Sequence, residues 1–406
     1  MNPTITLHQP STPLRLLLTL CALAVVSQLY VPLPILAQLA QELDVAPGVA
    51  AGAAGAFGLA YAAGFLVFGP LSDRLGRRQV MVWGLGALAL LSASVAWSHA
   101  APLLMAGRAL QGFAAAAFPP VVIAYLAERG SARQRSWAVA GLSTAFLSAG
   151  LLGQIYGGAV AGRWGLGVAM LPLALVYAAT AGALALTPAD PRPAARPDRW
   201  LAVYRPLGAL LADTRLRRVY APALLLLMCF VAFYLALDAQ AGSALQALGI
   251  TPLAARAVAL PGFLMPLAAA VLMPKLGARR LVALGLGLAS AGMAACAAAG
   301  PEHPLELLAA SVLFAAGLGF SVPSLIARVA GLADAPARGL AVALYTFVLF
   351  VGASVGPWLA QATAHWPLAT TLWLLAALLG AATVYAVSGR DVRAVSAVSG
   401  KCPPSA

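Results

Sequence analysis

The chain has 406 residues, of which 62% are hydrophobic and only 9% are charged, and its formal net charge is +13. A soluble domain carries about 25% charged residues, so this composition excludes a soluble globular protein. The basic residues are scattered between apolar runs without interleaved aromatic side chains, and nucleic-acid binding is not expected. The four cysteines show no CxxC or ligand spacing, so the sequence predicts no metal site and no cofactor.

Twelve apolar runs follow one another along the chain, each long enough for the roughly 20 residues that one bilayer crossing requires. Only helices satisfy their own backbone hydrogen bonds in lipid at this length. The sequence therefore predicts an all-α integral membrane fold. The predicted spans are 14–38, 49–71, 79–98, 101–127, 136–160, 165–187, 219–245, 252–274, 280–299, 305–329, 339–363 and 367–388.

An even number of spans places both chain ends on one side of the membrane. With both ends in the cytoplasm, all 25 basic residues except Arg108, Arg163 and Arg256 lie on that side, as the positive-inside rule expects. A Pro- and Arg-rich segment interrupts the pattern and suits a short interfacial helix near 200–212. The predicted organisation is a cytoplasmic tail at 1–13, a six-helix bundle at 14–187, a cytoplasmic linker at 188–218, a second six-helix bundle at 219–388 and a cytoplasmic tail at 389–406.

The two halves of the chain are similar in sequence. Residues 120–140 and 323–343 are identical at nine of 21 positions. This shift places span four on span ten and span five on span eleven, which favours two pseudo-symmetric bundles that arose by duplication.

A charged segment lies at the predicted membrane edge between spans two and three. It reads Gly-Pro-Leu-Ser-Asp-Arg-Leu-Gly-Arg-Arg over residues 69–78. Glycines allow backbones to approach closely, an acid can face a helix N-terminus, and arginines can pair with nearby acids. The order of these residues favours a tight, specific loop over an ordinary positive anchor. The candidate loop residues are Gly69, Asp73, Arg74, Gly76, Arg77 and Arg78.

This segment resembles the cytoplasmic signature of the major facilitator superfamily at every defining position. A second resemblance follows on span four, where Arg108, Gln111, Gly112 and Ala116 form the family's RxxQGxxxA pattern. On span five, a glycine-rich stretch partly matches the pattern of the drug/proton antiporter branch. That pattern has Gly-Pro where this chain has Gly153-Gln154. The chain is thus similar to twelve-span bacterial efflux members of the family.

The resemblance implies two six-helix bundles around a central cavity that opens alternately to each side. It also implies that the 69–78 loop acts as a cytoplasmic conformational latch. Asp73 would face the start of span eleven, and Arg74 or Arg77 would pair with Glu128 at the end of span four. The counterpart loop at 274–280 keeps a glycine and basic residues but has lost the acid.

Arg108 and Asp238 are charged residues that stand well inside predicted spans. Arg108 must face the bundle interior or a wet cavity, because a charge in lipid costs about 2.5–3.5 kcal/mol. It is either a substrate or proton-linked group or a structural arginine that hydrogen-bonds carbonyls of span one. Asp238, in the outer part of span seven, is either a buried carboxyl that exchanges a proton near neutral pH or an interfacial acid near water.

Further candidates are polar or small residues within the spans. Span one carries no acid, but Gln28 and Tyr30 are polar. Gln111 and Gln154 are candidates for the proton or substrate site, and Gln154 for the cavity lining. Closely spaced small residues on spans four, five and eleven predict tight helix contacts. These helix-packing candidates are Gly112, Gly150, Gly153, Gly157, Gly158, Gly356 and Pro357.

An apolar, aromatic and sparsely polar cavity suits an amphiphilic or drug-like compound. The leading hypothesis is a monomeric secondary transporter that exports such a compound by proton-coupled alternating access. A sugar or organic-acid carrier of the same fold is the alternative, and a non-transporting sensor or scaffold is the alternative from another class. No catalytic constellation appears, so an enzyme is not expected. The excess of arginine over lysine and the abundant alanine indicate a bacterial inner membrane.

Overall fold

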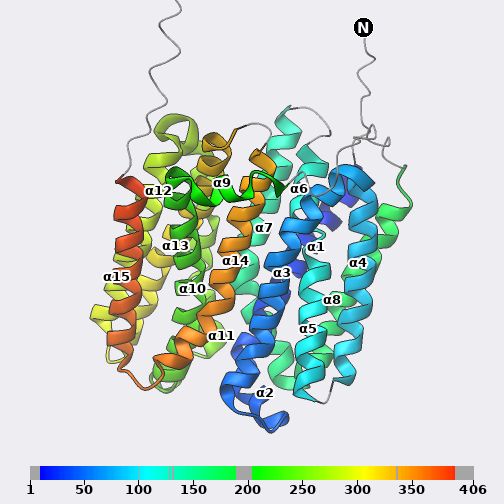
Figure 1. The fold of residues 1–406 in the computed structure, drawn as a ribbon. Coiled ribbons are helices and arrows are strands. Elements are labelled where there is room, and N and C mark those ends of the chain that lie inside the picture. Colours follow the sequence, from blue (N-terminus) through cyan, green and yellow to red (C-terminus); the bar gives the residue numbers. More distant parts are fainter. Residues whose placement is uncertain are drawn as a thin grey trace, which may run out of the picture.

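The computed structural model describes residues 10–98, 100–127, 129, 132–188, 204–334 and 337–388. Long helices run side by side through the molecule (Figure 1). The first half lies on one side and the second half on the other, with α7 and α14 between them in this view. The all-helical fold that the sequence predicts is confirmed.

The first half begins with α1, which ends at Tyr30, just before Pro32 and Pro34. Span four is likewise divided ahead of Pro119 and Pro120, because proline lacks the N–H that an α-helix interior needs. The helices of this half are α1 (Thr12–Tyr30), η1 (Leu33–Ile35), α2 (Leu36–Glu42), α3 (Pro47–Leu75), α4 (Arg77–Ser94), η2 (Val95–Trp97), α5 (Ala101–Ala115), α6 (Pro119–Ala127), α7 (Ala132–Tyr156), the π-helical turn η3 (Gly157–Ala161) and α8 (Gly162–Ala185).

The second half follows a short helix, α9 (Leu207–Ala212), which falls inside the range predicted for a helix in the linker. In Figure 1, α9 lies across the ends of the longer helices at the upper end of the molecule. The helices of this half are α10 (Thr214–Ala247), α11 (Pro252–Ala257), η5 (Leu260–Leu264), α12 (Met265–Ala299), α13 (Pro304–Leu332), α14 (Arg338–Ala362) and α15 (Leu368–Val387).

In the described chain, 10 helical segments are long and apolar enough to cross a membrane. Two of them, Ser148–Ala185 with 38 residues and Pro252–Ala299 with 48 residues, far exceed one crossing. Each contains a glycine with non-helical backbone angles, Gly165 (φ 82°) and Gly277 (φ 75°), at which one helix ends and the next begins. Each long segment therefore has room for two of the twelve predicted spans.

The loops after α3 and inside α12 share one local design. Gly76 (φ 92°) and Gly277 (φ 75°) both take the left-handed backbone that favours glycine. Two residues beyond each glycine stands an arginine that binds the end of the last helix of its own half. Arg78 donates to the carbonyls of Leu184 (2.7 Å) and Ala185, and Arg279 donates to the carbonyl of Val387 (2.7 Å). These contacts satisfy carbonyls that a helix C-terminus leaves unpaired.

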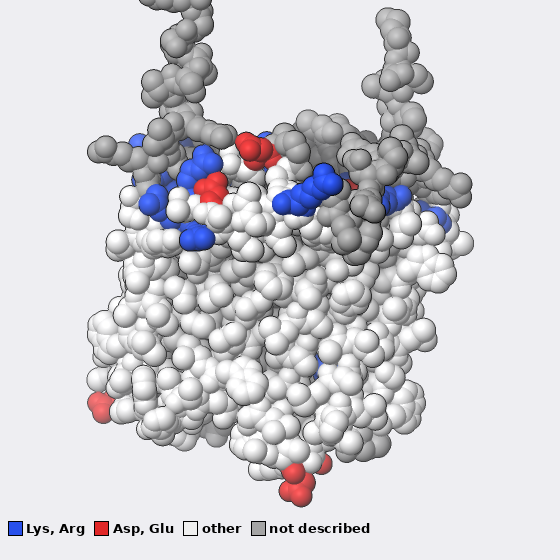
Figure 2. All heavy atoms as spheres, viewed as in Figure 1, with Lys and Arg blue, Asp and Glu red and all other residues white. Residues whose placement is uncertain are grey.

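Charged side chains gather at the two ends of the molecule and leave a broad uncharged belt between them (Figure 2). Lysine and arginine side chains cluster, together with some acids, at the end where α3 ends and α4 begins, here called the basic face, and the charged side chains seen at the opposite face are acids. The described residues of the basic face include Arg74, Arg77, Arg78, Lys275, Arg279, Arg280 and Arg338.

The predicted small-residue contacts bring backbones together. A Cβ on Gly153 would lie 2.7 Å from the carbonyl oxygen of Ser27, and one on Gly356 would lie 2.9 Å from that of Met228. Gly112 and Gly157 face the backbone of Phe57 and Val31 in the same way. Gly150 and Gly158 instead face side chains of the second half. The helix α14 continues through Pro357 to Ala362.

We expect Gly112→Val to destabilise the protein by about 1–3 kcal/mol, the usual cost of forcing extra atoms into a packed contact. The backbone of Phe57 on α3 occupies the space that the new side chain needs, and backbone cannot rotate away. Thermal unfolding in detergent measures the change. Gly86→Val is the matched control, because nothing lies within 4 Å of a Cβ at Gly86. Equal melting temperatures for the two variants would contradict the prediction.

Candidate functional site

The 69–78 loop joins the end of α3 to the start of α4 on the basic face. Asp73, near the end of α3, forms an ion pair across 2.9 Å with Arg77 at the start of α4, and the Asp73 side chain is 63% exposed. Arg77 also donates to the Ser72 hydroxyl at 3.1 Å. The structure thus brings Asp73 and Arg77 of the predicted latch together. Glu128, the predicted partner of Arg74 or Arg77, lies outside the described residues.

Arg108 is fully buried inside the first half, among polar atoms from three helices. It donates to the carbonyl of Gln28 on α1 at 2.7 Å and to the side-chain oxygen of Gln111 at 3.0 Å. Its guanidinium lies 4.3 Å from the ring centre of Phe57. Ser92 on α4 accepts from Gln28 and Gln111 at 2.6 and 3.2 Å. This network is the contact with a span-one carbonyl that the structural interpretation of Arg108 expects.

A second polar cluster joins the two halves near the opposite face. Asp238 on α10 forms an ion pair with Arg256 on α11, and both belong to the second half. Arg256 also donates from Nε to the side-chain oxygen of Gln154 on α7, in the first half, at 3.3 Å. Its third contact is the carbonyl of Pro252 on its own helix, at 3.1 Å. Three residues from three helices therefore form one chain of interactions, Asp238–Arg256–Gln154.

The three residues of this cluster differ in burial. The side chain of Arg256 is 1% exposed and that of Asp238 is 27% exposed, whereas Gln154 is fully buried. The amide of Gln154 donates to the carbonyl of Gly150 in its own helix at 2.9 Å, which leaves its oxygen free to accept from Arg256. The carboxylate is thus the member of the cluster that water or a ligand can reach.

Arg256 is the site residue that the sequence analysis did not single out as a candidate. It was one of three basic residues outside the predicted cytoplasmic side. A cation within a span demands a partner, and Asp238 is the described acid more than two turns from both ends of a membrane-spanning helix. A cation and an acid that both lie within predicted spans indicate an ion pair between Arg256 and Asp238.

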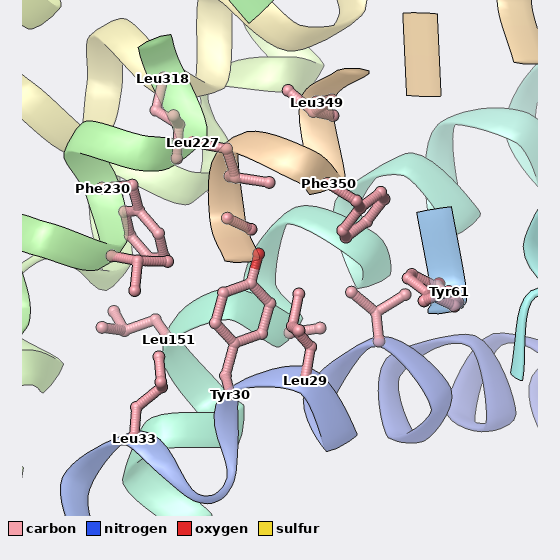
Figure 3. Packing of buried hydrophobic residues seen from close by; sticks show 14 of the residues in the cluster. Leu29, Tyr30, Leu33, Tyr61, Leu151, Leu227, Phe230, Leu318, Leu349 and Phe350 are labelled. Carbon is pink, nitrogen blue, oxygen red and sulfur yellow. The ribbon is translucent and has the colours of Figure 1, made fainter. Parts of the chain in front are cut away.

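Aromatic side chains fill the contact between the halves. The ring of Tyr61 on α3 packs edge-on against Phe350 on α14, with centroids 4.7 Å apart, and Phe65 stacks on Phe350 at 5.5 Å. Tyr30 on α1 meets Phe230 on α10 at 5.9 Å. Figure 3 shows the Tyr30 hydroxyl pointing away from α1, toward the side chains of the second half.

Two tyrosine hydroxyls in this region are buried without a hydrogen-bond partner. Among the described side chains, the hydroxyls of Tyr61 and Tyr234 have no partner, and neither does the side-chain oxygen of Gln28. Buried polar groups are normally paired. These three groups are therefore exceptions to that rule within the described part of the chain. The described residues hold no group of three or more metal-binding side chains.

Known proteins resemble the chain in sequence and in fold. The triacylglyceride transporter of Mycolicibacterium smegmatis is 36% identical over 99 residues, which are 24% of this chain and 18% of that protein. Multidrug resistance protein D of Escherichia coli is 34% identical over 100 residues, 24% of this chain and 25% of that protein. The matches to such curated relatives thus span about a quarter of their length or less.

The solved structure of the nucleoside transporter NupG has the same fold. Its TM-score is 0.69 at 12% identity, over 92% of this chain and 99% of that chain. The family comparison extends across both halves, because residues 18–265 match the Major Facilitator Superfamily. With more than half of its length matched, and with the two-bundle helical fold described above, the chain belongs to the Major Facilitator Superfamily of membrane transporters.

Proposed function

We propose that this transporter exports an amphiphilic organic compound in exchange for protons, and that Asp238 is the group that binds the proton. The observation that carries the proposal is the Asp238–Arg256 ion pair inside the membrane, with the carboxylate partly exposed and the guanidinium buried. A carboxylate in this position can take up a proton and give it back as its surroundings change. The proton then enters and leaves through one defined side chain.

The proposed orientation puts the basic face in the cytoplasm and both chain ends with it, in a bacterial inner membrane. The clustering of lysine and arginine on that face supports it (Figure 2). The opposite face, with α2 and the acids Glu42 at its end and Asp44 just beyond it, is then the outer face. In this orientation the Asp238–Arg256–Gln154 interactions link the two halves on the outer side.

The proposed substrate site is the aromatic contact between the halves. Rings such as those of Tyr30, Tyr61, Phe230 and Phe350 offer apolar surface, and the unpartnered hydroxyl of Tyr61 offers a polar contact. Sites of this kind suit a ligand with a large apolar part and few polar atoms. Relatives named for multidrug resistance and for triacylglyceride transport support an apolar cargo.

The test uses inside-out membrane vesicles with an acidified lumen and a panel of lipophilic cations, antibiotics and sugars. We expect an amphiphilic compound to collapse the pH gradient with wild-type protein and sugars to leave it intact. Asp238→Asn should abolish the response, because the amide cannot bind and release the proton. Glu306→Gln is the matched control, since Glu306 is an exposed acid in the first turn of α13. A gradient that Asp238→Asn still collapses would rule out Asp238 as the proton site.

A further inference from the structure

The contact between Gln154 and Arg256 links the proposed proton site to the relative position of the two halves. Asp238 and Arg256 both lie in the second half, so they stay together when the halves move apart. Gln154 lies in the first half, 102 residues away from Arg256 in sequence. Opening the outer side must therefore break the bond from Arg256 to Gln154, while the ion pair can persist.

We propose that Gln154 is a positioning residue for the proton site: it holds Arg256 against Asp238 only while the outer side is closed. Outer closure and the ionised carboxylate then favour each other. This inference rests on the proposed role of Asp238 as the proton-binding group. It assigns a task to the residue that replaces the proline of the efflux pattern, which has no side-chain oxygen to accept from an arginine.

The geometry supports a holding role. The amide of Gln154 is fixed by the carbonyl of Gly150, so its oxygen is directed at Nε of Arg256. The carbonyl of Pro252 holds a second nitrogen of the guanidinium, which leaves the third to face Asp238. Each of the three guanidinium nitrogens thus has a defined acceptor, and such pre-organisation favours one guanidinium position over many.

The charged group that faces Asp238 among the described residues is Arg256. The ionisable side chain nearest to Asp238 along its own helix is Tyr234, one turn earlier on α10, and Cys296 on α12 lies near that tyrosine. Neither carries a charge near neutral pH. Protonation of Asp238 therefore removes the partner of a cation that is 1% exposed, and the closed arrangement loses the charge pairing that stabilises it.

The direction in which pH shifts the opening of the outer side follows from the reciprocity between proton binding and conformation. If closure favours the ionised carboxylate, then acid must favour opening of the outer side. One linked proton changes the equilibrium by at most about tenfold per pH unit. Without the Gln154 contact, Arg256 pairs equally well with Asp238 in both conformations, and the pH dependence should disappear although the transporter can still open.

Spin labels on the outer side can report opening in purified protein without substrate. Suitable positions are Gln41 on α2 and Gln246 on α10, both exposed and in different halves. Cys402 is replaced by serine to avoid stray labelling, and the other cysteines are buried. Distance distributions between the labels are recorded by electron–electron double resonance, in mildly alkaline and in acidic buffer.

We expect the open population of the wild type to rise severalfold in acid. Gln154→Met, which keeps the side-chain length without an acceptor oxygen, should lose this response, as should Asp238→Asn. Gln154→Ala serves the same purpose if the methionine variant fails to fold. Gln38→Leu is the matched control, because Gln38 bonds Glu42 within α2, at 2.7 Å, and it should respond like the wild type.

Three results would overturn different parts of these proposals. If Gln154→Met and Gln154→Ala both open in acid as much as the wild type does, Gln154 has no part in the coupling. This conclusion holds even if Asp238→Asn neither opens in acid nor exchanges protons. If Asp238→Asn still opens in acid and still exchanges protons, the proposed function on which the inference rests is wrong. A wild type that does not open in acid contradicts the inference directly.

Discussion

Asp238→Leu is expected to destabilise the protein more than Arg256→Leu does, although the two substitutions break the same ion pair. Removing one partner of a buried pair costs about 3–5 kcal/mol, because an uncompensated charge remains. Asp238→Leu leaves the guanidinium of Arg256, which is 1% exposed, without its counter-charge, so the full range applies. Arg256→Leu leaves a carboxylate that is 27% exposed and can protonate, so a cost below that range is expected.

The double variant separates pairing from function. Asp238→Leu together with Arg256→Leu removes both charges, and its cost should be well below the sum of the two single costs, because the sites are in contact. Thermal unfolding in detergent gives the three values against wild type. All three variants should fail to exchange protons for substrate in vesicles. Additive costs, or equal costs for the two single variants, would contradict the ion pair as described.

Arg108→Lys is expected to destabilise the protein by about 1.5–3 kcal/mol, the contribution of one hydrogen bond to a charged group. The guanidinium reaches the carbonyl of Gln28 at 2.7 Å and the side-chain oxygen of Gln111 at 3.0 Å with two different nitrogens. An ammonium is a single point charge that cannot reproduce this fork. One of the two acceptors, both fully buried, is then left without its donor.

The same variant distinguishes the two interpretations of Arg108. If the arginine only holds α1 against α5, transport per folded molecule should stay near the wild-type level while the melting temperature falls. If it also takes part in transport, exchange should fall at least tenfold beyond the loss of folded protein. Arg163→Lys is the control, because Arg163 is exposed on the opposite side of the membrane from most arginines. An unchanged melting temperature in Arg108→Lys would speak against both hydrogen bonds.

The sequence predicts the fold well because lipid leaves few choices. A run of about 20 apolar residues must be a helix, and the basic residues indicate how successive helices alternate. The breaks inside spans were harder to place. Span eight is divided into α11 and η5 before α12 begins, and Pro252, Pro261 and Pro266 stand at or just inside the starts of these three helices. The first turn of a helix tolerates proline, so a new helix can begin at each one.

The site was predicted in part. Arg108, Gln111, Gln154 and Asp238 were recognised as unusual because each is a polar residue in an apolar run. Their partners could not be predicted, since a helix pattern specifies which residues share a face and not which face meets which. The bond from Arg256 to Gln154 joins residues from different halves, and only the packing of α7 against α11 brings them together.

The arginines that bind the last helix of each half bear on how the protein is made. Arg78 holds the carbonyl end of α8, and Arg279 holds that of α15. Each of these arginines bonds to a helix of its own half, so the hydrogen bonds of one half can form without the other half. A nascent chain can therefore complete and lock its first bundle once residue 187 has left the translocon, while the second bundle is still being synthesised.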